Sequence, residues 1–131
     1  MLKIENLTVG TKKDKKILKA VNNISFAINE GEIIGLAGES GCGKTMTALS
    51  IVNLLPQSFK IFNGNITFNN KDLTNMKEKE LCKIRGKEIG FIFQDTKQAL
   101  NPLMRIGSQI MEVLEINREK NEKREIRKEK Y

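Results

Sequence analysis

The chain has 131 residues, of which 39% are hydrophobic, and this size and composition fit a single globular domain rather than a disordered or fibrous chain. It has no uncharged apolar stretch long enough for a transmembrane helix, no apolar core for a secretory signal at its N-terminus, and two cysteines without metal-ligand spacing, which we expect to be free thiols. The net charge is +7, but basic and acidic residues are interleaved toward the C-terminus and aromatic residues make up only 5%, so we do not expect nucleic-acid binding.

The first predicted elements are two strands near the N-terminus. Residues 2–9 alternate between apolar and polar side chains, as a half-buried strand does. Residues 10–17 are a polar, lysine-rich connection, and residues 18–28 show the alternating pattern again. A turn signal over residues 29–32 ends this second strand. We expect the two strands to pair in an antiparallel manner.

A strand, a loop and a helix are predicted next. Residues 33–37 form a short continuous apolar run, which is typical of a strand that is covered on both faces. The glycine-rich residues 38–43 interrupt this run. Apolar residues then recur at helical spacing over residues 44–55, and Pro56 ends the predicted helix.

The remaining predicted elements alternate between strands and helices. Strands are expected over residues 60–69 and 88–94, and a short charged helix is expected between them over residues 77–84. Residues 101–102, Asn-Pro, open a loop, and residues 106–116 have the apolar spacing of a further helix.

The loop after the predicted strand carries the strongest functional motif. Eight consecutive residues match the phosphate-binding pattern G-x-x-x-x-G-K-[ST]: Gly38, Glu39, Ser40, Gly41, Cys42, Gly43, Lys44 and Thr45. The glycines let successive N–H groups turn toward a phosphate, and the following helix adds donors and a partial positive charge. Lys44 can reach the β- and γ-phosphates, and the Thr45 hydroxyl can bind Mg²⁺. We therefore expect these eight residues to bind ATP or a similar nucleotide with Mg²⁺.

Cys42 occupies a variable position of this motif. Two interpretations fit: a thiol activated by the N-terminus of the following helix, or a small residue that is merely tolerated there. If the thiol is exposed, we expect its alkylation to block the phosphate site.

The motif and two flanking segments resemble the ATP-binding subunits of ABC transporters. Residues 29–36, Asn-Glu-Gly-Glu-Ile-Ile-Gly-Leu, resemble the family's approach to the loop, and residues 91–95, Phe-Ile-Phe-Gln-Asp, resemble its Q-loop. The resemblance implies that Gln94 contacts Mg²⁺ or the attacking water and couples the site to membrane subunits. Gln94 is thus the candidate catalytic residue and, with Thr45, a candidate Mg²⁺ ligand. Taken alone, Gln94 is also explained as a polar residue that ends a strand.

The segments around the Q-loop narrow this resemblance. Residues 99–103, Ala-Leu-Asn-Pro-Leu, and residues 107–110, Gly-Ser-Gln-Ile, resemble the oligopeptide, dipeptide and nickel importer group, and residues 83–89 agree with it. The resemblance does not distinguish peptide from nickel. It implies transmembrane permease subunits and a second ATP-binding subunit as partners, ATP and Mg²⁺ as cofactors, and a peripheral position on the cytoplasmic face of the cell membrane.

The resemblance also implies a fold class and a division of the chain. The fold would be α/β, namely a P-loop NTPase core of the ABC nucleotide-binding type. This core would be incomplete, with an N-terminal antiparallel β subdomain and the start of a helical subdomain. Residues 1–131 would be a partial ABC ATP-binding domain. Residues 1–104 would hold the β subdomain, the phosphate loop and the Q-loop, and residues 105–131 the start of the helical subdomain.

Several parts of the family pattern are absent from this sequence. They are the Leu-Ser-Gly-Gly signature, a strand ending in the catalytic Asp-Glu pair, and the switch histidine. The adenine-stacking aromatic expected near residues 10–13 is replaced by Gly-Thr-Lys-Lys. We therefore expect the chain alone to bind nucleotide with negligible hydrolysis. Because the strand at residues 33–37 would lack its neighbours, we also expect marginal stability.

Three functional hypotheses remain from the sequence. The chain is an N-terminal fragment or split product of an energy-coupling ATPase subunit, a binding-only or inert remnant, or an unrelated P-loop protein such as a kinase. The third requires Gln94 and the Asn-Pro-Leu segment to be coincidences, so it ranks last.

Overall fold

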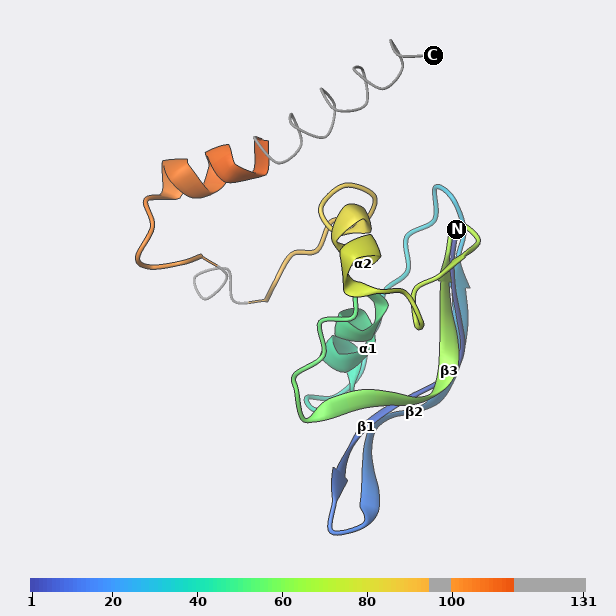
Figure 1. The fold of residues 1–131 in the computed structure, drawn as a ribbon. Coiled ribbons are helices and arrows are strands. Elements are labelled where there is room, and N and C mark those ends of the chain that lie inside the picture. Colours follow the sequence, from blue (N-terminus) through green and yellow to red (C-terminus); the bar gives the residue numbers. More distant parts are fainter. Residues whose placement is uncertain (95–99, 115–131) are drawn as a thin grey trace. The chain divides into compact units, whose positions relative to one another are not determined.

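The computed structural model describes residues 1–94 and 100–114. The chain divides into two compact units, Met1–Gly90 and Phe91–Tyr131. The elements of the first unit, in chain order, are β1 (Leu2–Lys13), β2 (Lys16–Ile28), α1 (Lys44–Ile51), β3 (Phe59–Phe68), β4 (Lys71–Asp72) and α2 (Glu78–Ile84) (Figure 1).

The first unit is built on one antiparallel sheet. Its strand order is β2-β1-β3-β4, and each neighbouring pair is antiparallel. The predicted antiparallel pairing of the first two strands is therefore confirmed. The lysine-rich connection expected over residues 10–17 is wrong, because β1 continues to Lys13 and β2 starts at Lys16 around a turn at Asp14 and Lys15. The backbone pairing of β1 with β2 extends through this ribbon, although most of its side chains are polar.

A hydrophobic core lies between the sheet and the helices of this unit. Its buried side chains come from β1, β2, β3, the segment after β4, and α2: Ile4, Leu7, Val9, Val21, Ile66, Leu73, Leu81 and Ile84. Both helices lie on the same side of the sheet (Figure 1). Burying one such side chain contributes about 1.5–3 kcal/mol, so this cluster holds α2 and the sheet together.

Arg85 links α2 to the C-terminal end of α1. Its guanidinium donates hydrogen bonds to the carbonyl oxygens of Val52 (2.7 Å) and Asn53 (3.1 Å), which follow α1. It also pairs with Glu78 of α2, and this hydrogen bond lowers the pKa of the Glu78 carboxyl below its ordinary value. The helix that carries the phosphate loop is thus fixed at its far end by a charged side chain.

The predicted strand at residues 33–37 is wrong. The segment has no strand pairing, and Ile33 is 96% exposed. A strand of a parallel sheet forms only against neighbouring strands, and none of the described residues supplies one. The apolar run therefore remains extended chain with exposed side chains. The expected marginal stability rests on this segment and stays a prediction.

The strand expected over residues 88–94 is also wrong. Only Ile89 forms an isolated bridge, with Arg85, and Ile92 and Phe93 are exposed. The other predicted elements of the first unit agree with the structure within a few residues. The helix expected at 44–55 ends earlier, at Ile51.

The second unit contains a helix over residues 106–114, which confirms the helix expected there as far as the structure describes it. Among the described residues, no helix has the length and apolar character that crossing a membrane requires. The expected division at residue 104 stays a prediction.

Candidate functional site

The phosphate motif lies between the extended segment 33–37 and α1. Gly43 caps the N-terminus of α1 with a φ of 95°, and no side chain caps that end. The first turn of α1 contains no acidic residue. The N–H donors and the positive end of the helix dipole therefore face the loop without a competing carboxylate, which suits a bound anion.

The buried face of α1 carries two hydroxyl groups. Thr47 and Ser50 are nearly inaccessible to solvent. The Thr47 hydroxyl donates to the carbonyl oxygen of Gly43 (3.0 Å), and the Ser50 hydroxyl donates to that of Thr47 (2.7 Å). Both hydroxyls are therefore satisfied within α1 and its cap, and they lie on its buried face.

Gly43 makes a close approach to the sheet that no other residue type allows. A Cβ atom built on Gly43 would lie 2.2 Å from the carbonyl oxygen of Ala20 in β2. The register between β1 and β2 shifts at this point, because Val9 pairs with Val21 whereas Gly10 pairs with Lys19. Ala20 is thus the extra residue of a β-bulge, and the loop packs against that bulge.

Gly38 closes the other end of the loop. Its φ is 155°, and a Cβ built there would lie 2.7 Å from the Cys42 sulfur. Gly41, between them, has a φ of 81°. The loop backbone therefore turns back on itself with little side-chain bulk, as a phosphate cradle requires.

Lys44 reaches back across this loop. Its ammonium donates hydrogen bonds to the carbonyl oxygens of Gly38 (2.8 Å) and Glu39 (2.7 Å), and it lies 3.4 Å from the Cys42 sulfur. A cation is thus enclosed by the loop residues themselves. Phosphate oxygens are stronger acceptors for an ammonium than neutral carbonyls, so a bound phosphate fits this arrangement.

The other motif residues are accessible to a ligand. Glu39, Ser40 and Thr45 are exposed. Within residues 1–94 and 100–114, no group of three or more His, Cys, Asp or Glu side chains could hold a metal ion. The Thr45 hydroxyl therefore fits a Mg²⁺ ion only if the ion takes its other ligands from phosphate and water, which is the usual preference of Mg²⁺.

Gln94 belongs to the second unit, whereas the eight loop residues belong to the first. Its side chain is exposed. Its expected contact with Mg²⁺ or water stays a prediction. Asp95 and Ala99, at the edges of the two segments that support the family resemblance, lie outside the described residues.

The Asn-Pro-Leu segment is held to the helix that follows it. The Gln109 side chain accepts a hydrogen bond from the Asn101 N–H (3.0 Å) and donates to the carbonyl oxygens of Asn101 (3.0 Å) and Met104 (3.1 Å). The Asn101 side chain in turn accepts from the N–H of Leu103 (3.0 Å). Asn101 and Gln109, which lie in the two segments that resemble the importer group, are therefore joined by hydrogen bonds.

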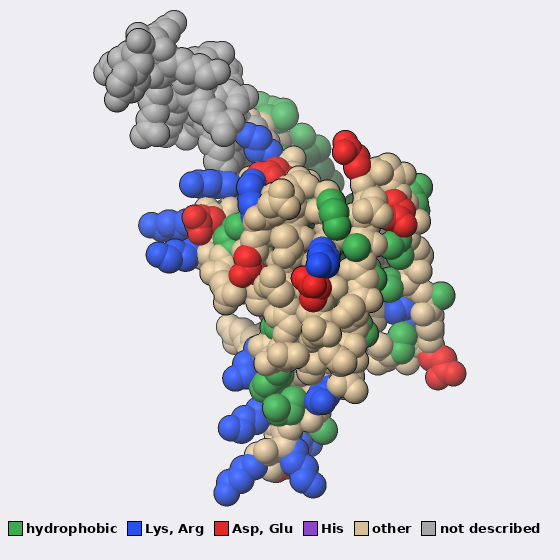
Figure 2. All heavy atoms as spheres, turned by 90° about the vertical axis from the view of Figure 1, so that its right-hand side faces the viewer, with side chains coloured by type: hydrophobic (Ala, Val, Ile, Leu, Met, Phe, Trp, Pro, Cys, Tyr) green, Lys and Arg blue, Asp and Glu red, His purple; other side chains and the backbone are tan. Residues whose placement is uncertain are grey.

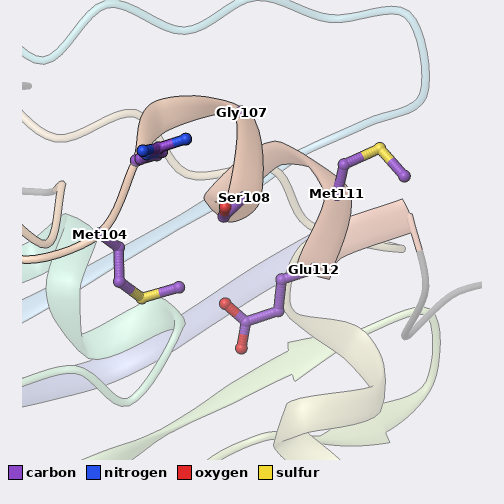
Figure 3. Close-up of a pocket in the computed structure, with 6 residues that line it drawn as sticks. Met104, Gly107, Ser108, Met111 and Glu112 are labelled. Carbon is purple, nitrogen blue, oxygen red and sulfur yellow. The ribbon is translucent and has the colours of Figure 1, made fainter.

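A shallow hollow lies along the same helical segment (Figure 3). Its lining residues are Met104, Arg105, Gly107, Ser108, Met111 and Glu112. None of them belongs to the phosphate motif. The hollow is wide open, and it contains no cluster of catalytic groups, so we assign it no role in nucleotide binding.

The contact with Ala20 and the anchor at Arg85 were not predicted from the sequence. Ala20 acts through its backbone carbonyl, which carries no signal in the residue type. Arg85 lies within a segment that agrees with the importer group, but nothing in its spacing indicated contact with α1.

Cys42 is exposed and free, as is Cys82. We expect iodoacetamide to alkylate Cys42 and to weaken ATP binding at least tenfold, because the added group would fill the loop that Lys44 now crosses. Nucleotide affinity before and after modification checks this result. After treatment with iodoacetamide, the Cys82→Ser variant should lose ATP affinity as the wild-type chain does. The ATP affinity of the Cys42→Ala variant should not change on this treatment. Equal ATP affinity in modified and unmodified chains would contradict the prediction.

Comparisons with known proteins show the family of the chain. A family model described as "ABC transporter" matches residues 21–130. The chain is 44% identical over 115 residues to an oligopeptide transport ATP-binding protein, AppD, of Bacillus subtilis, covering 87% of this chain and 35% of that protein. It is 42% identical over 130 residues to a dipeptide transport ATP-binding protein, DppD, of the same organism, covering 98% and 38%. The chain therefore spans about a third of the length of these curated relatives.

The fold is similar to solved cassettes as well. The dimeric structure of MJ0796, a bacterial ABC transporter cassette, matches with a TM-score of 0.69 and 34% identity over 79% of this chain and 42% of that one. A post-hydrolysis state of the same ATP-binding cassette, bound to ADP and Pi, matches with a TM-score of 0.66 and 30% identity.

Proposed function

The chain belongs to the ABC transporter family, and we propose that it is an ATP-binding, energy-coupling part of a peptide-type importer. One observation supports the binding role above the others. The Lys44 ammonium is enclosed by the carbonyl oxygens of Gly38 and Glu39 at the uncapped N-terminus of α1. This arrangement supports a role of the loop in binding the phosphates of a nucleotide.

The roles of the residues follow from their positions. The N–H groups of the loop and of the first turn of α1 would bind the phosphates, and Lys44 would neutralise part of their charge. Thr45 would contribute a hydroxyl to a Mg²⁺ ion, which offsets phosphate charge when it is bound. Gln94 would contact this ion or the attacking water. The same chemistry would hold either ATP or ADP.

The proposed partners follow from the relatives. Two of them are named as oligopeptide and dipeptide transport ATP-binding proteins, which supports a peptide rather than nickel as the transported solute. We propose transmembrane permease subunits as partners, and a position on the cytoplasmic face of the membrane. Because a similar cassette is dimeric, we also propose a second ATP-binding subunit as a partner.

The chain alone is proposed to bind nucleotide without appreciable turnover. Its sequence contains no histidine and no Asp-Glu pair. Phosphoryl transfer to water requires an oriented nucleophile, and the phosphate loop by itself does not provide a base. A binding-only role without a transport partner is the alternative, and co-purification with a permease would decide against it.

Titration of the chain with ATP, ADP and AMP in the presence of Mg²⁺ tests the nucleotide site. We expect ATP and ADP to bind at least tenfold more tightly than AMP, because the loop and Lys44 hold the β- and γ-phosphates. Isothermal titration calorimetry gives the three affinities directly. Equal affinity for AMP and ATP would contradict a phosphate-binding role, and so would the absence of any ATP binding.

A further inference from the structure

The turn that joins β1 to β2 carries a concentrated positive charge. Its five exposed lysines are Lys12, Lys13, Lys15, Lys16 and Lys19. With Asp14 as the only acid between them, residues 12–19 have a net charge of +4, which is more than half of the chain's +7. The basic side chains gather around the lower end of the first unit in Figure 2, where Figure 1 places this turn. We call residues 12–19 the basic hairpin.

The lysines of the basic hairpin form no ion pair with the described residues. Within the described residues, the ion pairs involve Lys3, Lys71 and Arg85, and none involves a lysine of the basic hairpin. Lys19 donates one hydrogen bond, to the side-chain oxygen of Asn22 (3.1 Å). The charges of the other four lysines are therefore available to a partner. Such a partner must be strongly anionic.

Two aliphatic side chains lie among the lysines. Ile17 is 43% exposed and pairs with Lys12 across the ribbon, and Leu18 is 53% exposed and pairs with Thr11. The basic hairpin thus presents exposed hydrocarbon inside a ring of positive charge. The long lysine side chains can place their ammonium groups beside such a hydrocarbon patch while remaining hydrated.

This combination favours a lipid surface over a nucleic acid. Residues 10–19 contain no aromatic side chain, whereas single-stranded nucleic acids are bound largely by stacking on aromatic residues. A bilayer with anionic headgroups offers a dense layer of phosphate charge above an apolar layer. Clusters of four to eight basic residues with adjoining apolar side chains suit such a surface.

We propose that the basic hairpin binds the surface of a membrane that contains anionic phospholipids. The lysines contact the headgroups, and Ile17 and Leu18 reach the boundary of the acyl chains. None of the residues that form this contact belongs to the phosphate motif. The contact would hold the subunit at the membrane in addition to any protein partner, and it does not require nucleotide.

Sedimentation of the full chain with vesicles tests this contact in the absence of nucleotide. We expect binding to vesicles of phosphatidylglycerol and phosphatidylcholine, and at least tenfold weaker binding to vesicles of phosphatidylcholine alone. Replacing Lys12, Lys13, Lys15 and Lys16 with glutamine should lower the partition coefficient about 600-fold, since each lysine near a charged bilayer contributes about a factor of five. The Ile17→Thr/Leu18→Thr variant should lose the binding that persists at 0.5 M salt.

The matched control removes four exposed lysines from another part of the same unit. Glutamine at Lys77, Lys79, Lys83 and Lys87 changes the net charge equally and should lower vesicle binding less than fivefold. An equal loss in both quadruple variants would overturn the proposal, as would equal binding to neutral and anionic vesicles. Tighter binding to a single-stranded oligonucleotide than to anionic vesicles would overturn it in favour of nucleic acid. Lys44→Ala should bind vesicles normally, so a failure of the nucleotide site is distinguished from a failure of this contact.

Discussion

Lys44→Ala is expected to weaken ATP binding by tenfold or more. The Lys44 ammonium is enclosed by two carbonyl oxygens of the loop at 2.7–2.8 Å, and a phosphate would replace these acceptors by stronger ones. A hydrogen bond to a charged group contributes about 1.5–3 kcal/mol, and every 1.4 kcal/mol is a factor of ten in affinity. Calorimetric titration of ATP into the wild-type chain and the variant measures the difference.

Two comparisons separate this loss from a general effect of charge or stability. Lys79→Ala removes an equal charge from the exposed surface of α2 and should leave ATP affinity within about twofold. Lys44→Ala should unfold at nearly the same denaturant concentration as the wild type, because the side chain of Lys44 contacts only its own loop among the described hydrogen bonds. Unchanged ATP affinity in Lys44→Ala would remove the main argument for the site.

Gly43→Ala is expected to damage both the fold and the site. The φ of Gly43 is 95°, and an added Cβ would lie 2.2 Å from the Ala20 carbonyl oxygen. A non-glycine residue in such a conformation costs about 1–3 kcal/mol before any clash is considered. Because backbone on both sides must move, the start of α1 should shift away from β2. We expect a loss of stability of at least about 2 kcal/mol and no measurable ATP binding.

Gly86→Ala provides the matched control for this substitution. Gly86 has a similar φ of 73°, but nothing lies within 4 Å of a Cβ built there. This variant should therefore show only the conformational cost, of about 1 kcal/mol, and should keep its ATP affinity. Urea unfolding and ATP titration of both variants provide the comparison. If Gly43→Ala were no less stable than Gly86→Ala, the close packing of the loop on the β-bulge would be refuted.

The sequence was most informative where the structure depends on local rules. Alternating side chains predicted the strands that contain Ile4 and Val21, because each strand buries one of these side chains in the core. The glycines of the phosphate motif predicted its tight backbone turns, since left-handed conformations favour glycine. The loop between the apolar segment 33–37 and α1 was thus identified from residue types and spacing alone.

The sequence-based predictions are wrong where the conformation of a segment depends on neighbouring strands. Residues 33–37 have the composition of a buried strand, but a strand is defined by its neighbours, and the described residues place none beside Ile33. The prediction of a connection over residues 10–17 was wrong in the opposite sense. Pairing with β2 makes a strand of Lys12 and Lys13 despite their polarity. The contact of Gly43 with Ala20 joins residues distant in sequence through a backbone oxygen, which no side-chain pattern encodes.

The distribution of the core along the chain has a consequence for synthesis. Among residues 1–94 and 100–114, every side chain of the buried cluster lies between Ile4 and Ile84, and the sheet contains no strand later than β4. All residues of this unit have therefore left the ribosome once residue 90 has emerged, and domains generally fold as units during synthesis. We expect the antiparallel sheet to assemble first during translation. The apolar segment 33–37 would still be exposed when this sheet has formed.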